Sequence, residues 1–420
     1  MSSSTPRSSA SGAMSPGAPV PPARRRLLVV ATAAVSALMV LVLLVAGLAV
    51  TEVILRAMKA PPKPGSLVLH PSLGWDRTPP WEKPIPATAA AAPGAKPLTI
   101  LFIGDSFTHN TAWSRLTVEA LNARGIAATG WEAGVSGYGQ VQEWMKLRML
   151  LPELNPDLVV LLFYGWNDPR DNCPVPGIIY TPEMMGRPYL AAGSDLVAEP
   201  AGFWMDVRGL EVYHQFFEGW WYRRVMSSSR RAMKAGGADA VAQRGTPELT
   251  IYTDPLTWMP LYQPSQQAGA YVSRAWEETR RAIGLVVQAC RTQGCGLVVA
   301  GIDSPLTIDR DVFDAHVATS ALYRADDFDT GLPLRRFAEA CAAAGVTPVL
   351  PAPALARYAA KVNRKIYDGN PGDLSGHLLP DAQEVLAAEV ADGIQAWLRT
   401  RAAPAAPSAA PTPAGAPPPP

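Results

Sequence analysis

The central part of the chain alternates between continuous apolar runs and segments whose apolar residues repeat with a helical period. The apolar runs predict buried strands at 98–106, 128–135, 157–165 and 296–304, with a shorter one at 347–353. Helical patterns lie between them at 111–125, 140–151, 266–292 and 332–344, and a last helix is predicted over 381–400. This alternation predicts an α/β domain whose central parallel sheet is covered by helices on both faces.

A different pattern lies near the N-terminus, where residues 27–50 form an uncharged apolar run of 24 residues. About 20 apolar residues span a bilayer core as a helix, so this run predicts one transmembrane helix. Three arginines at 24–26 and Arg7 give the preceding side four positive charges and no acid. The positive-inside rule then predicts a single-pass cell-membrane protein whose main domain lies outside the cytoplasm. A cleaved signal peptide, with a weak site at 47–49, is the alternative, although its apolar region would be about 7–15 residues.

Composition separates the two ends of the chain from its middle part. Both ends are rich in Ala, Pro, Ser and Gly and contain no aromatic residue, which is typical of disordered segments. The predicted organisation is a disordered cytoplasmic N-terminus at 1–26, the transmembrane helix at 27–50, a linker and wrapping segment at 51–96, one large domain at 97–400 and a disordered tail at 401–420. The net charge is +1 and no basic block follows residue 26, so no nucleic-acid partner is expected.

The alternation stops between residues 169 and 265, in a stretch rich in Pro, Trp, Tyr and Met. Such length without regular signals indicates a long irregular insertion, which is often functional. Its aromatic and basic residues include Trp204, Trp220, Trp221, Tyr222, Arg223, Arg224 and Trp258. Flat apolar faces beside such donors predict a surface that binds sugar rings. The alternative is that the aromatic residues form a small core of the insertion itself.

Polar residues follow the predicted strands at the ends where ligands bind in open parallel sheets. They are Gly104-Asp105-Ser106 after the first strand, Gly134 at the second, Gly165-Trp166-Asn167-Asp168 after the third, and Asp373 and His377 in the C-terminal loop. A serine after a strand is by itself more often a helix cap. Together, these residue types offer a nucleophile, a base, and donors for a developing negative charge.

Four blocks, FIGDSFT, EAGVSGYG, GWND and GDLSGHL, resemble those of the SGNH (GDSL-like) hydrolase superfamily. The resemblance covers most of the predicted domain outside the insertion and implies a flavodoxin-like three-layer sandwich. It implies that Ser106 is the nucleophile and that His377 is the general base, oriented by Asp373. It also implies an oxyanion hole formed by the backbone amides of Ser106 and Gly134 and by the side chain of Asn167.

The chemistry suits these residue types, but the orienting carboxylate departs from the family pattern. A serine hydroxyl is a poor nucleophile until a positioned imidazole takes its proton, and donors fixed beforehand stabilise the tetrahedral intermediate. The family commonly has Asp three residues before His, whereas Asp373 stands four before His377. Asp368 and Asp381 are therefore rivals, and a Ser/His dyad is a further alternative.

Three more positions depart from the pattern around the glycine block and the serine block. Glu132 stands where the family usually has Asn, which changes how that loop is held. Gly137 is a rival to Gly134 as a backbone donor. His109 stands where a small residue is common, and it is interpreted as a helix-start residue rather than a second base.

The predicted function is an extracytoplasmic serine esterase that hydrolyses acyl or acetyl esters of a glycan or lipid. An O-acyltransferase acting on a cell-surface polysaccharide would use the same triad, and a non-catalytic binding module is the third alternative. Neither GxGxxG nor GxxxxGK[ST] follows a strand, which argues against nucleotide binding, and the GxSxG elbow of α/β-hydrolases is also missing. The five histidines and four cysteines form no CxxC or clustered set, so neither a metal nor a cofactor is expected.

Overall fold

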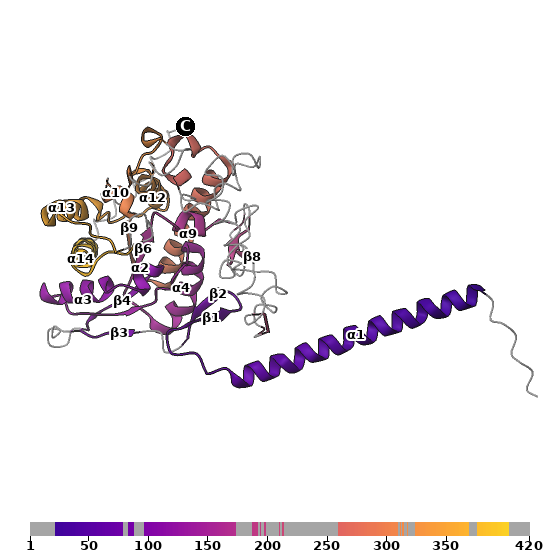
Figure 1. Ribbon diagram of the computed structural model, residues 1–420. Coiled ribbons are helices and arrows are strands. Elements are labelled where there is room, and N and C mark those ends of the chain that lie inside the picture. The colour runs from indigo at the N-terminus through magenta and orange to yellow at the C-terminus, as the bar shows by residue number, and fades with distance from the viewer. Residues whose placement is uncertain are drawn as a thin grey trace, which may run out of the picture. The chain divides into compact units, whose positions relative to one another are not determined.

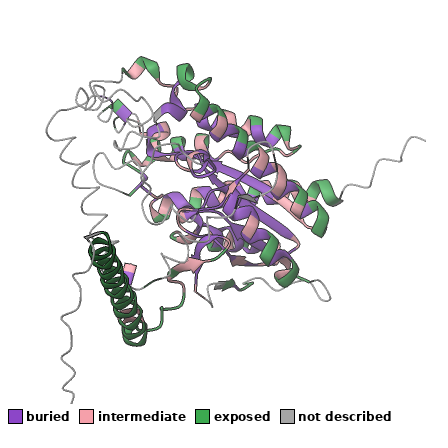
Figure 2. Cartoon of the chain, turned by 90° about the vertical axis from the view of Figure 1, so that its right-hand side faces the viewer, coloured by how far each residue is buried: buried purple, intermediate pink, exposed green. Residues whose placement is uncertain are grey.

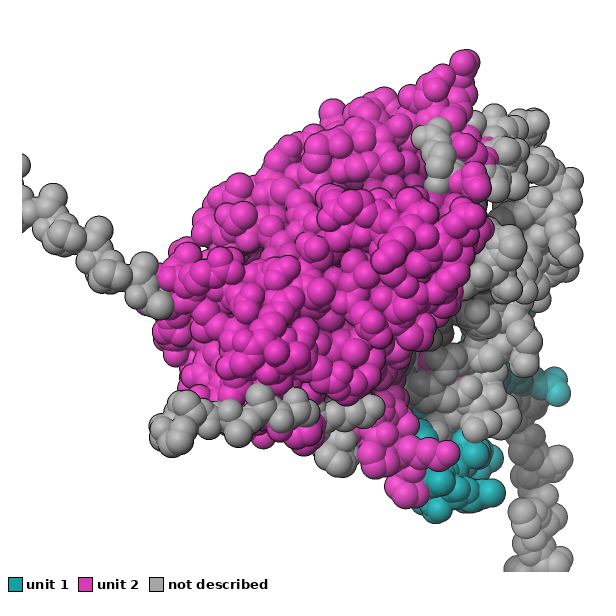
Figure 3. Space-filling model, turned by 90° about the vertical axis from the view of Figure 1, so that its left-hand side faces the viewer, with its two compact units in different colours: residues 1–60, 210–212 teal, residues 61–209, 213–420 magenta. Residues whose placement is uncertain are grey.

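The computed structural model describes residues 22–78, 83–87, 96–173, 187–191, 194, 197–198, 210, 212–213, 259–309, 311, 313–314, 317, 324–368 and 376–402. The predictions of disorder for the first 21 residues and beyond residue 402, and those for most of the insertion, lie outside these residues. The chain divides into two compact units (Figure 3). The first contains residues 1–60 and 210–212, and the second contains residues 61–209 and 213–420.

The first unit contains one long helix, α1, which runs from Pro22 to Met58. Its 37 residues correspond to about 55 Å at 1.5 Å per residue, so it extends beyond the predicted run 27–50 at both ends. Its apolar side chains are exposed along its length (Figure 2). The part from Ala23 to Met58 is long and apolar enough to cross a membrane, by length and composition only.

The second unit is built on a five-stranded sheet with the order β3-β5-β4-β6-β9. Its strands are β3 (Lys83–Ile85), β5 (Ala128–Glu132), β4 (Leu98–Ile103), β6 (Leu158–Tyr164) and β9 (Gly296–Ile302). The last four are parallel, whereas β3 pairs antiparallel with β5. The predicted parallel sheet is thus found in four strands, and the antiparallel edge strand β3 was not predicted. The sheet is mixed because a short strand from the wrapping segment adds to its β5 edge.

The strand predicted at 347–353 is reduced to one isolated parallel bridge, between Val349 and Ala300. Pro348 and Pro351 flank the bridge. Val349 directs both its N–H and its carbonyl oxygen to β9, so the next position that would donate to β9 is 351, where proline has no amide hydrogen. The apolar run was identified correctly, but Pro351 limits the pairing to a single residue.

Helices lie on both sides of the sheet in Figure 1, where α3 packs with α14 and α4 packs with α9. The predicted helices are found as α3 (Trp113–Ala123), α4 (Gln140–Leu154), α9 (Ala270–Gln293), α12 (Leu332–Ala343) and α14 (Pro380–Ala402). Helix α13 (Ala352–Val362) was not predicted, and its Pro353 lies in the first helical turn, where proline is tolerated. The short elements are α2 (Ser106–His109), α5 (Asp168–Asp171), α10 (Pro305–Ile308), β7 (Tyr189–Leu190), β8 (Val197–Ala198), η3 (Met259–Tyr262), η4 (Pro264–Gln266) and η5 (Ala325–Asp327).

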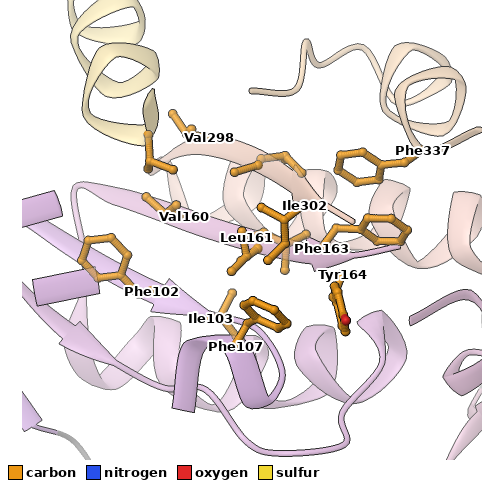
Figure 4. Packing of buried hydrophobic residues seen from close by; sticks show 14 of the residues in the cluster. Phe102, Ile103, Phe107, Val160, Leu161, Phe163, Tyr164, Val298, Ile302 and Phe337 are labelled. Atoms are coloured by element: carbon orange, nitrogen blue, oxygen red, sulfur yellow. The ribbon is translucent and has the colours of Figure 1, made fainter. Parts of the chain in front are cut away.

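The main core surrounds β6, an interior strand whose seven residues are all buried. Phe163 of β6 stacks on Phe337 of α12 with ring centroids 4.1 Å apart (Figure 4). On the neighbouring strand, Phe102 meets Trp113 of α3 edge-on at 5.3 Å. A strand covered on both faces needs apolar residues at every position, which is why the sequence shows a continuous apolar run there.

The wrapping segment forms a hairpin of β1 (Leu67–His70) and β2 (Gly74–Arg77), called here the N-terminal hairpin. Its Trp75 packs with Val135 and Tyr138 in a small hydrophobic cluster of its own. Both partners come from the segment that follows β5. The hairpin therefore covers the loop in which the glycine block lies.

Candidate active site

Ser106 begins the short helix α2, directly after β4 and the Gly104-Asp105 turn. Asp105 caps this helix, because its Oδ1 accepts a hydrogen bond from the N–H of Phe107 at 2.9 Å. A Cβ at Gly104 would lie 3.1 Å from the carbonyl oxygen of Leu162 and would crowd the neighbouring strand. The Gly-Asp-Ser sequence thus folds into a tight turn that presents the Ser106 hydroxyl at the carboxyl end of β4.

His377 lies beside this hydroxyl although the two residues are 271 positions apart in the chain. The His377 Nε2 is 3.0 Å from the Ser106 Oγ, which is hydrogen-bonding distance. Its ring is held against that of Phe107, with centroids 4.8 Å apart. The His377 backbone is held as well, since its carbonyl accepts from the N–H of Asp368 at 2.7 Å. The structure therefore brings together the two residues predicted as nucleophile and base.

The predicted orienting carboxylate, Asp373, lies outside the described residues. The two rival carboxylates are both described. Asp368 Oδ1 accepts from the backbone N–H of the candidate base at 2.5 Å, so it holds the main chain. Asp381 accepts hydrogen bonds from Tyr358 and Arg364 on the outer side of α14. These contacts give both rivals a structural role, and the choice of Asp373 stays a prediction.

Asn167 follows β6 and shares a partner with Ser106. Its Nδ2 donates to Asp105 Oδ2 at 3.4 Å and to Asp171 Oδ2 at 3.1 Å. The Ser106 hydroxyl is also 3.4 Å from Asp105 Oδ2, so the amide and the hydroxyl meet at one oxygen. Hydrogen bonds of 3.4 Å are long and weak. Asn167 can therefore exchange its Asp105 partner for a developing oxyanion without losing a strong bond.

Gly134 lies in the loop after β5, residues 133–139, called here the glycine loop. A Cβ at Gly134 would be 2.6 Å from the backbone nitrogen of His109 and 2.6 Å from the Cβ of Thr108. The glycine loop is therefore in close contact with α2, the helix that begins with Ser106. Only a residue without a side chain permits this approach, which places the Gly134 backbone next to the nucleophile's own helix.

Glu132, at the position where the resemblance leads one to expect Asn, contacts Arg77 and Ser114. Its Oε1 lies 3.6 Å from the Nη1 of Arg77, and its Oε2 accepts from the hydroxyl of Ser114 at 3.2 Å. Arg77 also donates to the carbonyl oxygen of Gly134 at 3.2 Å. Sequence reasoning gave Arg77 no role, and its distance of 57 residues from Gly134 left no local signal that could have shown it.

His109 and Gly137 also contribute to the position of the glycine loop. The His109 Nδ1 is 2.8 Å from the Oγ of Ser136, so this ring contacts the loop. His109 is the last residue of α2 rather than its first, which corrects its interpretation as a helix-start residue. Gly137 has a φ of +78°, and a Cβ there would meet the ring of Trp75 at 3.5 Å. The presence of glycine at this position is therefore explained by its backbone conformation, independently of any role as a donor.

Buried carboxyl groups lie beneath the site. Burial raises the pKa of Asp105 to about 6, while hydrogen bonds from the Phe107 N–H and from Asn167 act to lower it. Burial also raises the pKa of Glu143 and of Asp168 well above their usual values, and negative neighbours add to both shifts. Carboxyl groups that resist ionisation place less negative charge behind the candidate oxyanion hole.

A second polar network lies at the carboxyl end of β9. Asp303 is buried there, and its Oδ1 accepts from the hydroxyl of Tyr262 at 2.6 Å and from the N–H of Ser304 at 2.7 Å. Its carbonyl accepts from the hydroxyl of Tyr367 at 2.8 Å. Burial raises the pKa of Asp303 to about 6. Sequence reasoning gave it no role, although an Asp-Ser pair after a strand was a signal that could have found it.

The fold and the Ser106–His377 pair together define a class, α/β proteins with a serine and a histidine in contact at the carboxyl ends of parallel strands. No protein-family model and no curated protein matches the chain. Solved structures similar to it include the psychrotrophic esterase EstA from Pseudoalteromonas sp., at 12% identity over 72% of this chain and 99% of that one, with a TM-score of 0.33.

Two further similar structures are the acetyl xylan esterase AlAXEase and a GDSL-like lipase from Bacteroides thetaiotaomicron. The first is 15% identical over 71% of this chain and 99% of its own, with a TM-score of 0.31. The second is 12% identical over 71% and 89%, with a TM-score of 0.29. Likenesses this distant assign no function, which has to come from the geometry of the site.

Proposed function

We propose that the protein is a serine esterase in which Ser106 is the nucleophile and His377 is the general base. The observation that carries the proposal is the distance of 3.0 Å between Ser106 Oγ and His377 Nε2. Nucleophilic catalysis by serine requires this contact, because the imidazole removes the hydroxyl proton as the serine attacks. A binding module would not need it.

The reaction follows from these positions. The Ser106 oxygen attacks the ester carbonyl while His377 takes its proton, and His377 then returns that proton to the leaving alcohol. The resulting acyl-enzyme is hydrolysed by water that His377 activates in the same way. The backbone amides of Ser106 and Gly134 and the Nδ2 of Asn167 stabilise the oxyanion of both tetrahedral intermediates. Asp373 orients the imidazole.

The test compares wild-type protein with Ser106→Ala and His377→Ala on short p-nitrophenyl esters. Either substitution should lower kcat by about 10⁴-fold or more, because the residues of a catalytic unit act together. Ser106→Ala should also abolish labelling by a fluorophosphonate probe. Labelling that persists in this variant would contradict the proposal. Melting temperatures should stay close to that of the wild type, since neither side chain fills the core.

The proposal includes the location and the substrate. Helix α1 anchors the chain in the cell membrane by a single pass, and the positive charges before it keep the catalytic domain outside the cytoplasm. An enzyme in that place meets acyl or acetyl esters of glycans and lipids. The supporting feature is the apolar, exposed surface of α1 over a length that exceeds a bilayer core of about 30 Å.

We also propose that the fold is a flavodoxin-like three-layer sandwich. The strand order β5-β4-β6-β9 supports it, since the chain starts inside the sheet, adds one strand on one side and then proceeds to the other. Ligands bind in such sheets where the strand order reverses, outside the carboxyl ends of the strands. Here the reversal lies between β4 and β6, which end beside Ser106 and Asn167.

A further inference from the structure

Two buried arginines lie next to the proposed oxyanion donors, and neither belongs to the four sequence blocks. Arg77 comes from the N-terminal hairpin and Arg187 from the insertion, and each is only 4% exposed. A guanidinium keeps its charge when it is buried, so its burial is costly unless the group is paired and hydrogen-bonded. The partners of these two side chains therefore show what they hold in place.

Arg77 contacts the chain on both sides of the Gly134 N–H, once in the glycine loop and once at the end of β5. Its Nη1 donates to the carbonyl oxygen of Gly134 at 3.2 Å, just after that amide in the chain. The same nitrogen lies 3.6 Å from the carboxylate of Glu132, two residues before Gly134. One side chain thus fixes both flanks of the proposed backbone donor.

Trp75, two residues before Arg77, holds the next part of the glycine loop. Its Nε1 donates to the carbonyl oxygen of Ser136 at 3.1 Å. The hydroxyl of Tyr138 donates back to the carbonyl oxygen of Trp75 at 2.6 Å, and the two rings meet edge-on at 5.8 Å. The hairpin therefore contacts the glycine loop through hydrogen bonds and ring packing as well as through charge.

Arg187 connects the Trp75 ring to the residue that holds the second donor, Asn167. Its guanidinium carbon lies 5.1 Å from the centre of the Trp75 ring. Its Nη2 is 3.5 Å from Asp171 Oδ1, and its Nη1 donates to the Asp171 carbonyl oxygen at 3.2 Å. Asp171 Oδ2 in turn accepts from the Nδ2 of Asn167 at 3.1 Å.

We infer that Arg77, Trp75 and Arg187 form one buried clamp that positions the Gly134 N–H and the Asn167 Nδ2 for the oxyanion. The inference rests on the proposed function. The three clamp residues act through Gly134 and Asn167, so they are positioning residues. Part of the oxyanion hole is then held by a hairpin that precedes the catalytic domain in the chain.

The clamp has a kinetic consequence because donors stabilise a transition state only when they are fixed beforehand. Displacement of such a group by about 1 Å costs about 10²-fold in rate. Arg77→Met keeps an unbranched apolar stem and removes the donors, whereas Arg77→Lys keeps the charge beside Glu132 but loses the planar fork. The effect should therefore be larger for methionine than for lysine.

Two control variants separate positioning from stability. Arg124→Met removes an arginine that joins α3 to α14 through a 2.6 Å bond to Asp392, away from the clamp. Ile394→Ala opens the core at a fully buried position of α14, three residues before Trp397. Trp397 lies against Gly296 at the amino end of β9, the end of the sheet opposite to the site.

The experiment measures kcat and KM on p-nitrophenyl acetate, inhibition by phenylboronic acid, and hydrogen exchange of peptides covering residues 132–138, all in the full chain. Arg77→Met should lower kcat by about 10- to 10²-fold with little change in KM, and weaken boronate binding by a similar factor. It should also speed exchange in the glycine loop. Arg124→Met should change none of these, and Ile394→Ala should lower the melting temperature alone.

Two results would overturn the clamp. One is unchanged exchange of the glycine loop in Arg77→Met and Arg77→Lys, and the other is a loss of kcat no larger than that of Ile394→Ala. A wild-type chain that hydrolyses no ester and whose Ser106 takes no fluorophosphonate would instead overturn the proposed function. The exchange measurement, which needs no activity, would then decide by itself whether Arg77 holds the loop.

Discussion

Replacement of Gly134 by alanine tests the proposed oxyanion hole with a single added carbon. The new Cβ would lie 2.6 Å from the backbone nitrogen of His109 and 2.8 Å from the carbonyl carbon of Thr108. Non-bonded carbon atoms are normally about 3.5–4.0 Å apart, so the glycine loop would have to move by roughly 1 Å. Two of the three nearest atoms belong to the backbone of α2 and the third is the Cβ of Thr108, so none of them can turn away as the end of a flexible side chain could.

The size of the effect follows from that displacement. Loss of one oxyanion donor typically costs about 10²–10³-fold in kcat, equivalent to about 2.7–4 kcal/mol. We expect kcat of Gly134→Ala to fall by about 10²-fold, since a shift of about 1 Å weakens the donor without deleting it. The overpacking should also lower the free energy of unfolding by about 1–3 kcal/mol.

The assay is hydrolysis of a short p-nitrophenyl ester, with thermal melting measured in parallel. Gly284→Ala is the matched control, because a Cβ at this position of α9 would meet no atom within 4 Å. Alanine is favoured over glycine inside a helix by about 1 kcal/mol, so this variant should be fully active and slightly more stable. A Gly134→Ala protein with wild-type kcat and a lower melting temperature would refute the reasoning, since the loop would have moved without affecting the reaction.

Three further predictions concern charge and location. Burial raises the pKa of Glu143 well above 4.5, so the stability linked to its protonated form is present below pH 4.5 and is lost as pH rises through the folded-state pKa. Glu143→Gln should therefore flatten the decline of melting temperature above pH 4.5, and an unchanged decline would contradict this. Asp373→Asn should lower kcat far more than Asp368→Asn, because the imidazole loses its orienting charge; equal, mild effects would indicate a dyad. Protease added to intact spheroplasts should degrade the catalytic domain, whereas a protected domain would place it in the cytoplasm.

The parts of the fold that the sequence predicts well are those where burial alone decides the structure. β6 is covered on both faces, so its apolar run could be read directly. β3 was missed because it has three residues, one of them Pro84, and pairs through a segment with no periodicity. The strand at 347–353 was overpredicted because apolar character shows burial, whereas pairing with β9 depends on an amide hydrogen that Pro351 lacks.

The residues of the candidate site were likewise predicted only where the local sequence carries a signal. Ser106, Gly134, Asn167 and His377 each follow a strand or lie in a recognisable block, so local sequence pointed to them. Arg77 lies in a hairpin, and Gly134, to which it donates, is 57 residues away, so their contact is apparent only in the folded structure. Its pairing with Glu132 gives a physical reason for a carboxylate at this position in place of the Asn of the pattern that the sequence resembles, because a buried guanidinium favours a carboxylate as its partner.

Both lateral edges of the sheet carry proline, and this has a consequence for how copies of the protein meet. Pro84 lies in β3 at one edge, and Pro348 precedes the single bridge at Val349 beyond β9. Exposed strand edges invite pairing between molecules, and proline blocks that pairing by removing a donor. With the proposed membrane anchor, the domain would meet its neighbours in two dimensions and at high local density. Edges that cannot accept another strand should let such domains crowd together without forming intermolecular sheets.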